Sequence, residues 1–258
     1  MGKLFNYKSL RNRMTLTVLI LLTVAIVVTT LSLSTSVKNT IANIVRDSAT
    51  QGAQAIANQL ASQLDTYRQQ LATAWTMSGA NGPSANSLQR LVANTPQAEG
   101  AWVRLGSNIR RVGTPWLELE NLPLTDLTAG ISNPVLGPND NWLLPVWHSI
   151  FDTDGEVIGL VGLMLDLHPL IDQLAALGGE IMVLNQQGEA VLGSTASMLM
   201  QGDARIGTKH SAITDAARGA LAQQAGAIAF ALSGEQQIIA YAPVQNTSWG
   251  LIHQLPYK

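Results

Sequence analysis

The sequence predicts an α+β protein with one transmembrane helix, a long stalk helix and two successive antiparallel-sheet units. Residues 14–37 carry no charged side chain, and residues 36–77 contain no proline. From about residue 98, short apolar runs alternate with turns rich in Gly, Asp and Asn. Long helices followed by groups of strands are typical of α+β proteins.

The first of these features, residues 14–35, is assigned to a transmembrane helix. About twenty apolar residues at ~1.5 Å each span a ~30 Å hydrocarbon layer. Residues 1–13 contain four basic residues and no acid, and short basic flanks stay in the cytoplasm. The alternative, a cleaved signal peptide, has a shorter apolar core and a small-residue cleavage site, and residues 31–36 offer no such site. We therefore expect a cytoplasmic tail at 1–13 and the main domain outside.

The composition limits the kinds of function that this exterior part can have. The chain contains no cysteine, so an exported domain has no disulfides and depends on its core. All 17 acidic residues lie beyond position 46, and the whole chain has a formal net charge of −2. A mildly acidic exterior domain is a poor nucleic-acid binder, so no nucleic-acid partner is expected.

The stalk helix is predicted over residues 36–77, where apolar residues recur every three or four positions. The pattern is regular from Leu60 through Leu64, Tyr67 and Leu71 to Trp75, which places them on one helical face. Such a stripe suits pairing with a second helix, or packing against a sheet of the same chain. Both interpretations can hold for different segments.

The remaining elements follow from turn signals and periodicity. The Asp-Gly step within 152–155 lies between apolar runs, which indicates a β-hairpin. Helices are predicted at 85–94, 170–177 and 214–224. Strands are predicted at 101–105, 109–112, 141–149, 157–167, 180–185, 189–193, 227–232, 236–243 and 249–254.

Two segments resemble a known family. Residues 131–170 run from Ile-Ser-Asn-Pro-Val through Pro-Val-Trp and the Asp-Gly turn to Gly-Leu-Val-Gly. Residues 238–251 read Ile-Ile-Ala-Tyr-Ala-Pro-Val, then Trp-Gly-Leu. Both are similar to blocks of double Cache sensor domains, and the order of elements matches that family over roughly residues 36–256.

The resemblance implies two PAS-like units outside a bacterial inner membrane, the membrane-distal one at 78–169 and the membrane-proximal one at 170–258. It implies a small-molecule sensing domain of a signal-transduction receptor that acts through chemotaxis, a histidine kinase or a diguanylate cyclase. Such receptors continue into a second membrane helix and an output domain. The sequence stops at Lys258, so we expect a truncated product or a separate signalling partner. The alternative is a non-catalytic membrane-anchored module that pairs with a partner receptor without binding a ligand.

The sequence departs from amino-acid-binding members of this family. Their Arg-x-Trp-Tyr run corresponds to Thr114, Trp116 and Leu117, and the position of the ligand Asp holds Met164. Asp166 is interpreted as a strand-end or surface residue. A buried ammonium needs a carboxylate partner, so a carboxylate or an apolar metabolite is favoured over a free amino acid.

Aromatic and basic residues between 100 and 150 supply the candidate ligand site. Small-ligand sites are mostly apolar with a few placed polar groups, and Arg binds carboxylates well. The alternative is ordinary core tryptophan beside surface arginine. The predicted ligand-binding residues are Trp102, Arg104, Arg111, Trp116, Trp142, Trp147 and Met164, with Arg110 nearby.

The sequence contains no motif that indicates an enzyme. The four histidines lack metal-ligand spacing, and no Gly-x-Ser-x-Gly or phosphate-loop motif is present. The Asp152-x-Asp154-Gly run matches only part of a calcium loop and is interpreted as a turn. We therefore expect no catalytic residues, no metal and no cofactor. The expected partners are a small-molecule ligand, the membrane and a second copy of the chain, bound through the stalk helix.

Overall fold

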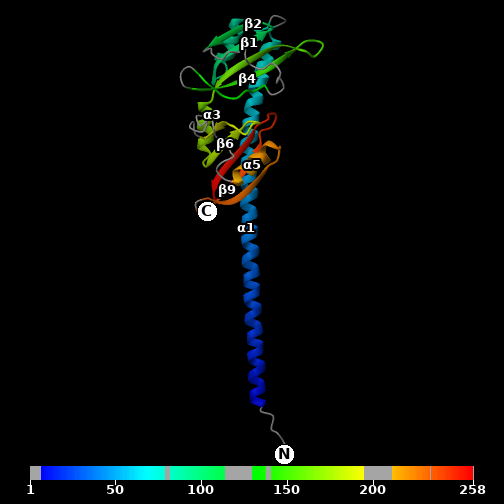
Figure 1. Cartoon of the computed structure of the whole chain (residues 1–258), viewed down its shortest axis with the longest axis vertical. Helices are drawn as coiled ribbons and strands as arrows, with labels where there is room; N and C mark the ends of the chain where they lie inside the picture. Colours follow the sequence, from blue (N-terminus) through cyan, green and yellow to red (C-terminus); the bar gives the residue numbers. More distant parts are fainter. Residues whose placement is uncertain are drawn as a thin grey trace, which may run out of the picture. The chain divides into compact units, whose positions relative to one another are not determined.

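The structure is a computed structural model that describes residues 7–78, 82–113, 130–137, 141–194, 211–232 and 234–257, with side chains from residue 21 onward. The chain divides into two compact units, Met1–Val45 and Arg46–Lys258. Helix α1 (Tyr7–Thr76) contributes to both units, as the blue to cyan helix of Figure 1. The predicted uninterrupted helix over the stalk is confirmed by α1.

The first unit is formed by the apolar part of α1. Among the described residues, one helix, α1, is both long enough and apolar enough to cross a membrane. Its large apolar side chains are exposed, for example Leu21 at 63% and Leu31 at 63%. The hydroxyl of Thr30 donates to the carbonyl of Ile26 at 2.8 Å, so this polar group is satisfied within the helix.

The first sheet has five strands in the order β2-β1-β5-β4-β3, all antiparallel. The β4–β5 hairpin closes at Asp152, whose Oδ1 accepts from the backbone N of Asp154 and Glu156 at 2.9 Å. The predicted Asp-Gly hairpin is thereby confirmed. The strands are β1 (Ala98–Leu105), β2 (Asn108–Gly113), β3 (Val135–Leu136), β4 (Trp142–Phe151) and β5 (Val157–Asp166).

The second sheet has five strands in the order β7-β6-β10-β9-β8. The predicted meander is confirmed by the antiparallel pairs β8–β9 and β9–β10, and β10 also pairs with β6. The strands are β6 (Glu180–Leu184), β7 (Ala190–Gly193), β8 (Gly226–Leu232), β9 (Glu235–Pro243) and β10 (Gly250–Pro256).

The described residues of the second unit also form three shorter helices. α2 (Ala85–Ala93) begins at Ser84, whose hydroxyl accepts from the Ser87 backbone N, and it packs on β1 and β2. α3 (His168–Ala176) follows β5, and α5 (Ser211–Leu221) packs on β8, β9 and β10. All three overlap the helices predicted from the sequence.

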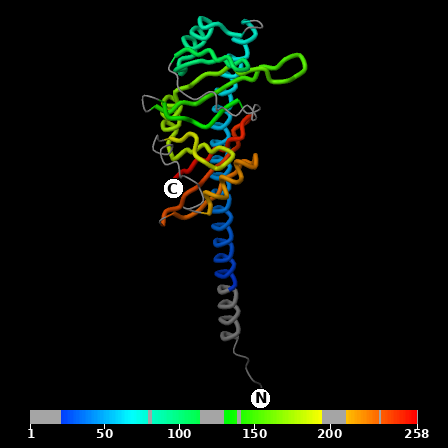
Figure 2. The backbone as a smooth tube through the Cα atoms, turned by 45° about the horizontal axis from the view of Figure 1, so that its top comes forward, coloured from blue at the N-terminus to red at the C-terminus, as the bar shows by residue number. Residues whose placement is uncertain are grey.

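The part of α1 in the second unit runs beside both sheets in two views (Figures 1 and 2). Polar contacts fix it there: Tyr67 donates to Gln97 at 2.5 Å, and Gln63 donates to Gln173 at 3.2 Å. Packing against its own domain is thus confirmed for this segment. Its buried residues are Ala49, Ala53, Ala57, Leu60, Ala61, Leu64 and Leu71.

Candidate functional site

A single row across the first sheet joins four residues from four strands. Arg111 on β2 pairs with Trp102 on β1, Trp102 pairs with Gly162 on β5, and Gly162 pairs with Trp147 on β4. Residues directly opposite each other in a sheet point to the same face. The row therefore places two tryptophans and one arginine on one face.

Gly162 allows the two tryptophans to share this face. A Cβ built on Gly162 would lie 2.3 Å from Cε2 and 2.7 Å from Nε1 of Trp102, so the indole lies flat over the glycine. Trp102 is fully buried and Trp147 is 7% exposed. We call Trp102, Gly162 and Trp147 the tryptophan floor.

Apolar side chains from the same strands surround the tryptophan floor. Leu143, Leu160 and Met164 are buried with the two tryptophans in one cluster, and Ile109 and Val135 pack against it. Met164 is fully buried two residues along β5 from Gly162, so the residue expected at the ligand-Asp position lies on this face.

The polar atoms of the tryptophan floor are unpaired donors. The indole Nε1 atoms of Trp102 and Trp147 are buried, and no described residue is a hydrogen-bond partner of either. A buried donor without a partner costs about 1–3 kcal/mol, so each such group calls for an explanation. A ligand with acceptor atoms over the tryptophan floor would remove this cost.

The arginines differ in which face they occupy. Arg111 is exposed and lies in the row of the tryptophan floor. Arg104, two residues beyond Trp102, lies on the same face, and its Nε donates to the carbonyl of Gly106 at 3.3 Å. Arg110 belongs to the opposite face, where it donates to the carbonyl of Pro83 at 3.2 Å.

The carboxylate nearest to Met164 along β5 already has partners. Oδ1 of Asp166 accepts from the backbone N of His168 at 3.0 Å and lies 2.9 Å from Nδ1 of the same residue. Asp166 thus stabilises the start of α3, as the strand-end interpretation predicted.

The structure brings together five of the seven residues predicted for the site, on one face of the first sheet. Trp142 lies on β4 five positions from Trp147, hence on the other face, and its buried Nε1 finds no partner in the part of the chain that the structure describes. Trp116, Thr114 and Leu117 lie outside the described residues. Sequence reasoning missed Gly162, although the Gly-x-x-Gly spacing of β5 pointed to a close approach.

Two side chains outside the tryptophan floor have pKa values shifted by burial. His148 lies on the opposite face of the first sheet, and Tyr67 lies on α1. Burial lowers the pKa of His148, whose strand neighbour on β5 is Val161. Burial also raises the pKa of Tyr67, the α1 residue that donates to Gln97.

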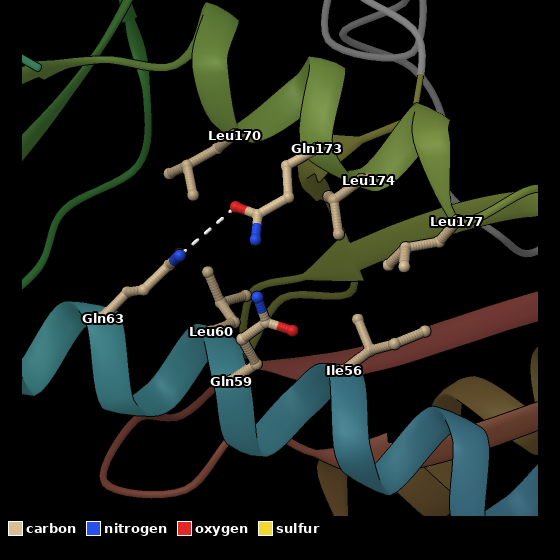
Figure 3. Close-up of a pocket in the computed structure, with 8 residues that line it drawn as sticks. All are labelled: Ile56, Gln59, Leu60, Gln63, Leu170, Gln173, Leu174 and Leu177. Atoms are coloured by element: carbon tan, nitrogen blue, oxygen red, sulfur yellow. Dashed lines mark hydrogen bonds between the residues drawn. The ribbon is translucent and has the colours of Figure 1, made fainter.

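A separate apolar groove lies between α1 and α3 (Figure 3). The hydrogen bond from Gln63 Nε2 to Gln173 Oε1 crosses it. No charged side chain and no unpaired buried donor is among its lining residues, so it offers less to a polar ligand than the tryptophan floor. The lining residues are Ile56, Gln59, Leu60, Gln63, Leu170, Gln173, Leu174 and Leu177.

A family model for the Cache domain matches residues 33–258. The chain belongs to the Cache domain family. The double Cache resemblance and the α+β fold predicted from the sequence are thereby confirmed. Cache domains are sensory, non-catalytic modules, and those of receptors are extracytoplasmic.

Solved structures share this fold at low sequence identity. The sensory domain of the Campylobacter jejuni chemoreceptor Tlp3 is 13% identical with a TM-score of 0.62, over 85% of this chain and 96% of that one. The same domain is also known with isoleucine bound, at a TM-score of 0.61 over 85% and 95% of the chains. The extracellular domain of the putative histidine kinase mmHK1S-Z3 is 15% identical with a TM-score of 0.64, over 81% and 93%. A search of curated proteins finds no significant match.

Proposed function

We propose that the chain is the ligand-sensing part of a bacterial transmembrane receptor, with the tryptophan floor as its small-molecule site. The observation that carries the proposal is a pair of buried indole donors, without a partner among the described residues, on one face of a Cache-fold sheet. In this proposal residues 78–169 form the membrane-distal Cache unit and residues 170–258 the membrane-proximal one. Residues 14–35 cross the inner membrane, with 1–13 in the cytoplasm.

The ligand is proposed to be an organic carboxylate with an apolar body. Two indole N–H groups and the Arg111 guanidinium are all donors, and they lie in one cross-strand row. Oδ1 of Asp166 already accepts from the backbone N of His168 at the start of α3, so this carboxylate is directed toward α3. Donors without a free carboxylate beside them favour an anion over a free amino acid.

A thermal-shift screen of the whole chain in detergent micelles tests this function. A carboxylate at one hundred times its Kd would stabilise the protein by about 2.7 kcal/mol, which raises the Tm by several degrees. A library of aromatic, alicyclic and aliphatic carboxylates beside the amino acids is sufficient. A complete library without one stabilising compound would contradict ligand sensing.

Two arginine variants separate binding from folding. Arg111→Gln removes the guanidinium in the row of the tryptophan floor, and we expect it to weaken any carboxylate hit about tenfold or more. Arg110→Gln is the matched control, because Arg110 is the neighbouring residue on the opposite face. Equal losses in both variants would place the carboxylate elsewhere.

The stalk is proposed to mediate a homodimer. An exposed stripe on α1 carries no charge, unlike the usual surface of a soluble helix. It consists of Gln51, Gln54, Ala55, Asn58, Gln59, Ser62, Thr66, Gln69 and Thr73. Because the chain has no native cysteine, Ser62→Cys tests the stripe by oxidative cross-linking, with Thr153→Cys in the exposed β4–β5 turn as control.

The second candidate, a module that pairs with a partner receptor without a ligand, rests on the same uncharged stripe. It predicts a different outcome in both tests: no stabilising compound, and cross-links from Ser62→Cys to another membrane protein instead of to a second copy.

A further inference from the structure

A short segment beside the tryptophan floor connects the two sheets. Residues Gly130–Asn133, which we call the strap, run along β4. The backbone N of Trp147 donates to the carbonyl of Gly130 at 2.8 Å, and the backbone N of Ser132 donates to Pro145 at 3.1 Å. Main-chain bonds on both sides of Ile131 therefore tie the strap to a strand of the tryptophan floor.

The far end of the strap reaches the second sheet through Asn133. Nδ2 of Asn185 donates to Oδ1 of Asn133 at 3.0 Å. Asn185 is 2% exposed at the end of β6, and its Oδ1 accepts from the backbone N of Gln187 at 3.0 Å and of Glu189 at 2.9 Å. The residue that organises the β6–β7 turn is thus the one that binds the strap.

At its other end, Gly130, the strap lies next to Arg68 of α1. Arg68 in turn contacts the β9–β10 turn of the second sheet. Gly130 has φ +63°, and a Cβ there would lie 2.7 Å from the Trp147 carbonyl and 3.2 Å from Nε of Arg68. Nη1 of Arg68 donates to the Asn246 carbonyl at 3.0 Å and to Asp65 at 3.1 Å. Asn246, in the β9–β10 turn, donates from Nδ2 to Asp65 at 2.7 Å.

We propose that the strap couples the tryptophan floor to the β6–β7 and β9–β10 turns of the second sheet, with Asn133 and Arg68 as its positioning residues. This inference rests on the proposed function, since it concerns how occupancy of that site is transmitted. Any displacement of Trp147 moves the carbonyl and amide groups to which the strap is bonded. The strap then either keeps both turn contacts or loses them together, which gives the second sheet two alternative arrangements.

Energetic coupling between two sites is reciprocal, so the strap can be tested from the second sheet without a ligand. The whole chain is labelled with 5-fluorotryptophan in detergent micelles, and the Trp147 resonance is assigned with Trp147→Phe. Asn185→Asp keeps an acceptor for the turn amides and removes the Nδ2 donor that binds both Asn133 and Oε2 of Glu189, so the variant is compared with and without Asn133. We expect a resolved shift of the Trp147 fluorine signal.

Two further variants test whether the effect of Asn185→Asp on Trp147 passes through Asn133. Gln187→Glu makes the same amide-to-acid change in the same turn at an exposed side chain, and we expect it to leave the Trp147 signal in place. In an Asn133→Ala background, Asn185→Asp should cause no additional shift of Trp147. An unchanged Trp147 signal in Asn185→Asp, or the same shift with and without Asn133, would overturn the proposal.

A second measurement covers the case in which Asn185→Asp does not fold. Asn133→Ala removes one exposed side chain and no strap backbone bond. We expect it to raise amide hydrogen exchange in peptides spanning 185–189 several-fold and to leave those spanning 226–232 unchanged. Equal exchange in wild type and variant at 185–189 would refute the strap. A carboxylate hit in the thermal screen would then still support the proposed function, because neither strap experiment uses a ligand.

Discussion

Replacing Gly162 by alanine is the sharpest test of how the tryptophan floor is built. The added Cβ would lie 2.3 Å from Cε2 of Trp102, whereas carbon atoms in contact lie about 3.5–4.0 Å apart. The indole must therefore move by more than about 1 Å, and it is fully buried in a packed sheet. Overpacking of this kind costs about 1–3 kcal/mol.

The assay is thermal unfolding of the whole chain in micelles. For a unit of this size, about 1–3 kcal/mol lowers the Tm by about 2 to 12 °C. Gly52→Ala is the control, because no atom of the described residues lies within 4 Å of its added Cβ and alanine is the better helix former by up to about 1 kcal/mol. A Tm for Gly162→Ala equal to that of wild type, with unchanged tryptophan emission, would refute the flat packing of Trp102 on Gly162.

The remaining predictions concern α1 and the other side of the first sheet. Leu64→Ala should cost about 2–5 kcal/mol in unfolding free energy, because the side chain is fully buried; a cost below 1 kcal/mol would contradict its place in the core. Tyr67→Phe should cost about 0.5–1.5 kcal/mol through the lost bond to Gln97, and Gln97→Ala should add little on top of it in a double-mutant cycle. The pKa of His148 is lowered by burial, so the unfolded chain takes up its proton first; stability should fall as the pH drops below about 6.5, and less steeply in His148→Gln. Equal pH profiles of wild type and His148→Gln, measured by urea unfolding, would rule out this contribution.

Local patterns in the sequence were sufficient for most elements of the fold. The three- and four-residue spacing of α1 and the Asp-Gly turn at 152–155 are short-range signals, and both elements form as predicted. The pairings β1–β5 and β6–β10 were not predictable in this way, since they join strands far apart in the sequence. Strand β3 escaped prediction because it is two residues long.

The candidate site shows the same division between local and long-range information. Composition drew attention to the tryptophans and arginines between 100 and 150, but it could not sort them by face. The register does so, because Trp102 and Trp147 both pair with Gly162, while Trp142 and Arg110 point to the other side. The role of a glycine beneath an indole depends on strand pairing that no single strand reveals.

The alanines of α1 have a mechanical consequence. Ala49, Ala53, Ala57 and Ala61 are buried at a constant spacing of four residues, whereas larger leucines begin at Leu60. A helix that slides by four residues moves about 6 Å along its axis and brings each alanine to the position of the next. A surface that packs against this row of alanines would then contact alanine side chains again, and no large side chain would have to leave its packed position. The alanine segment therefore presents a uniform surface of small side chains, whereas the larger leucines from Leu60 onward fit the core in one register only.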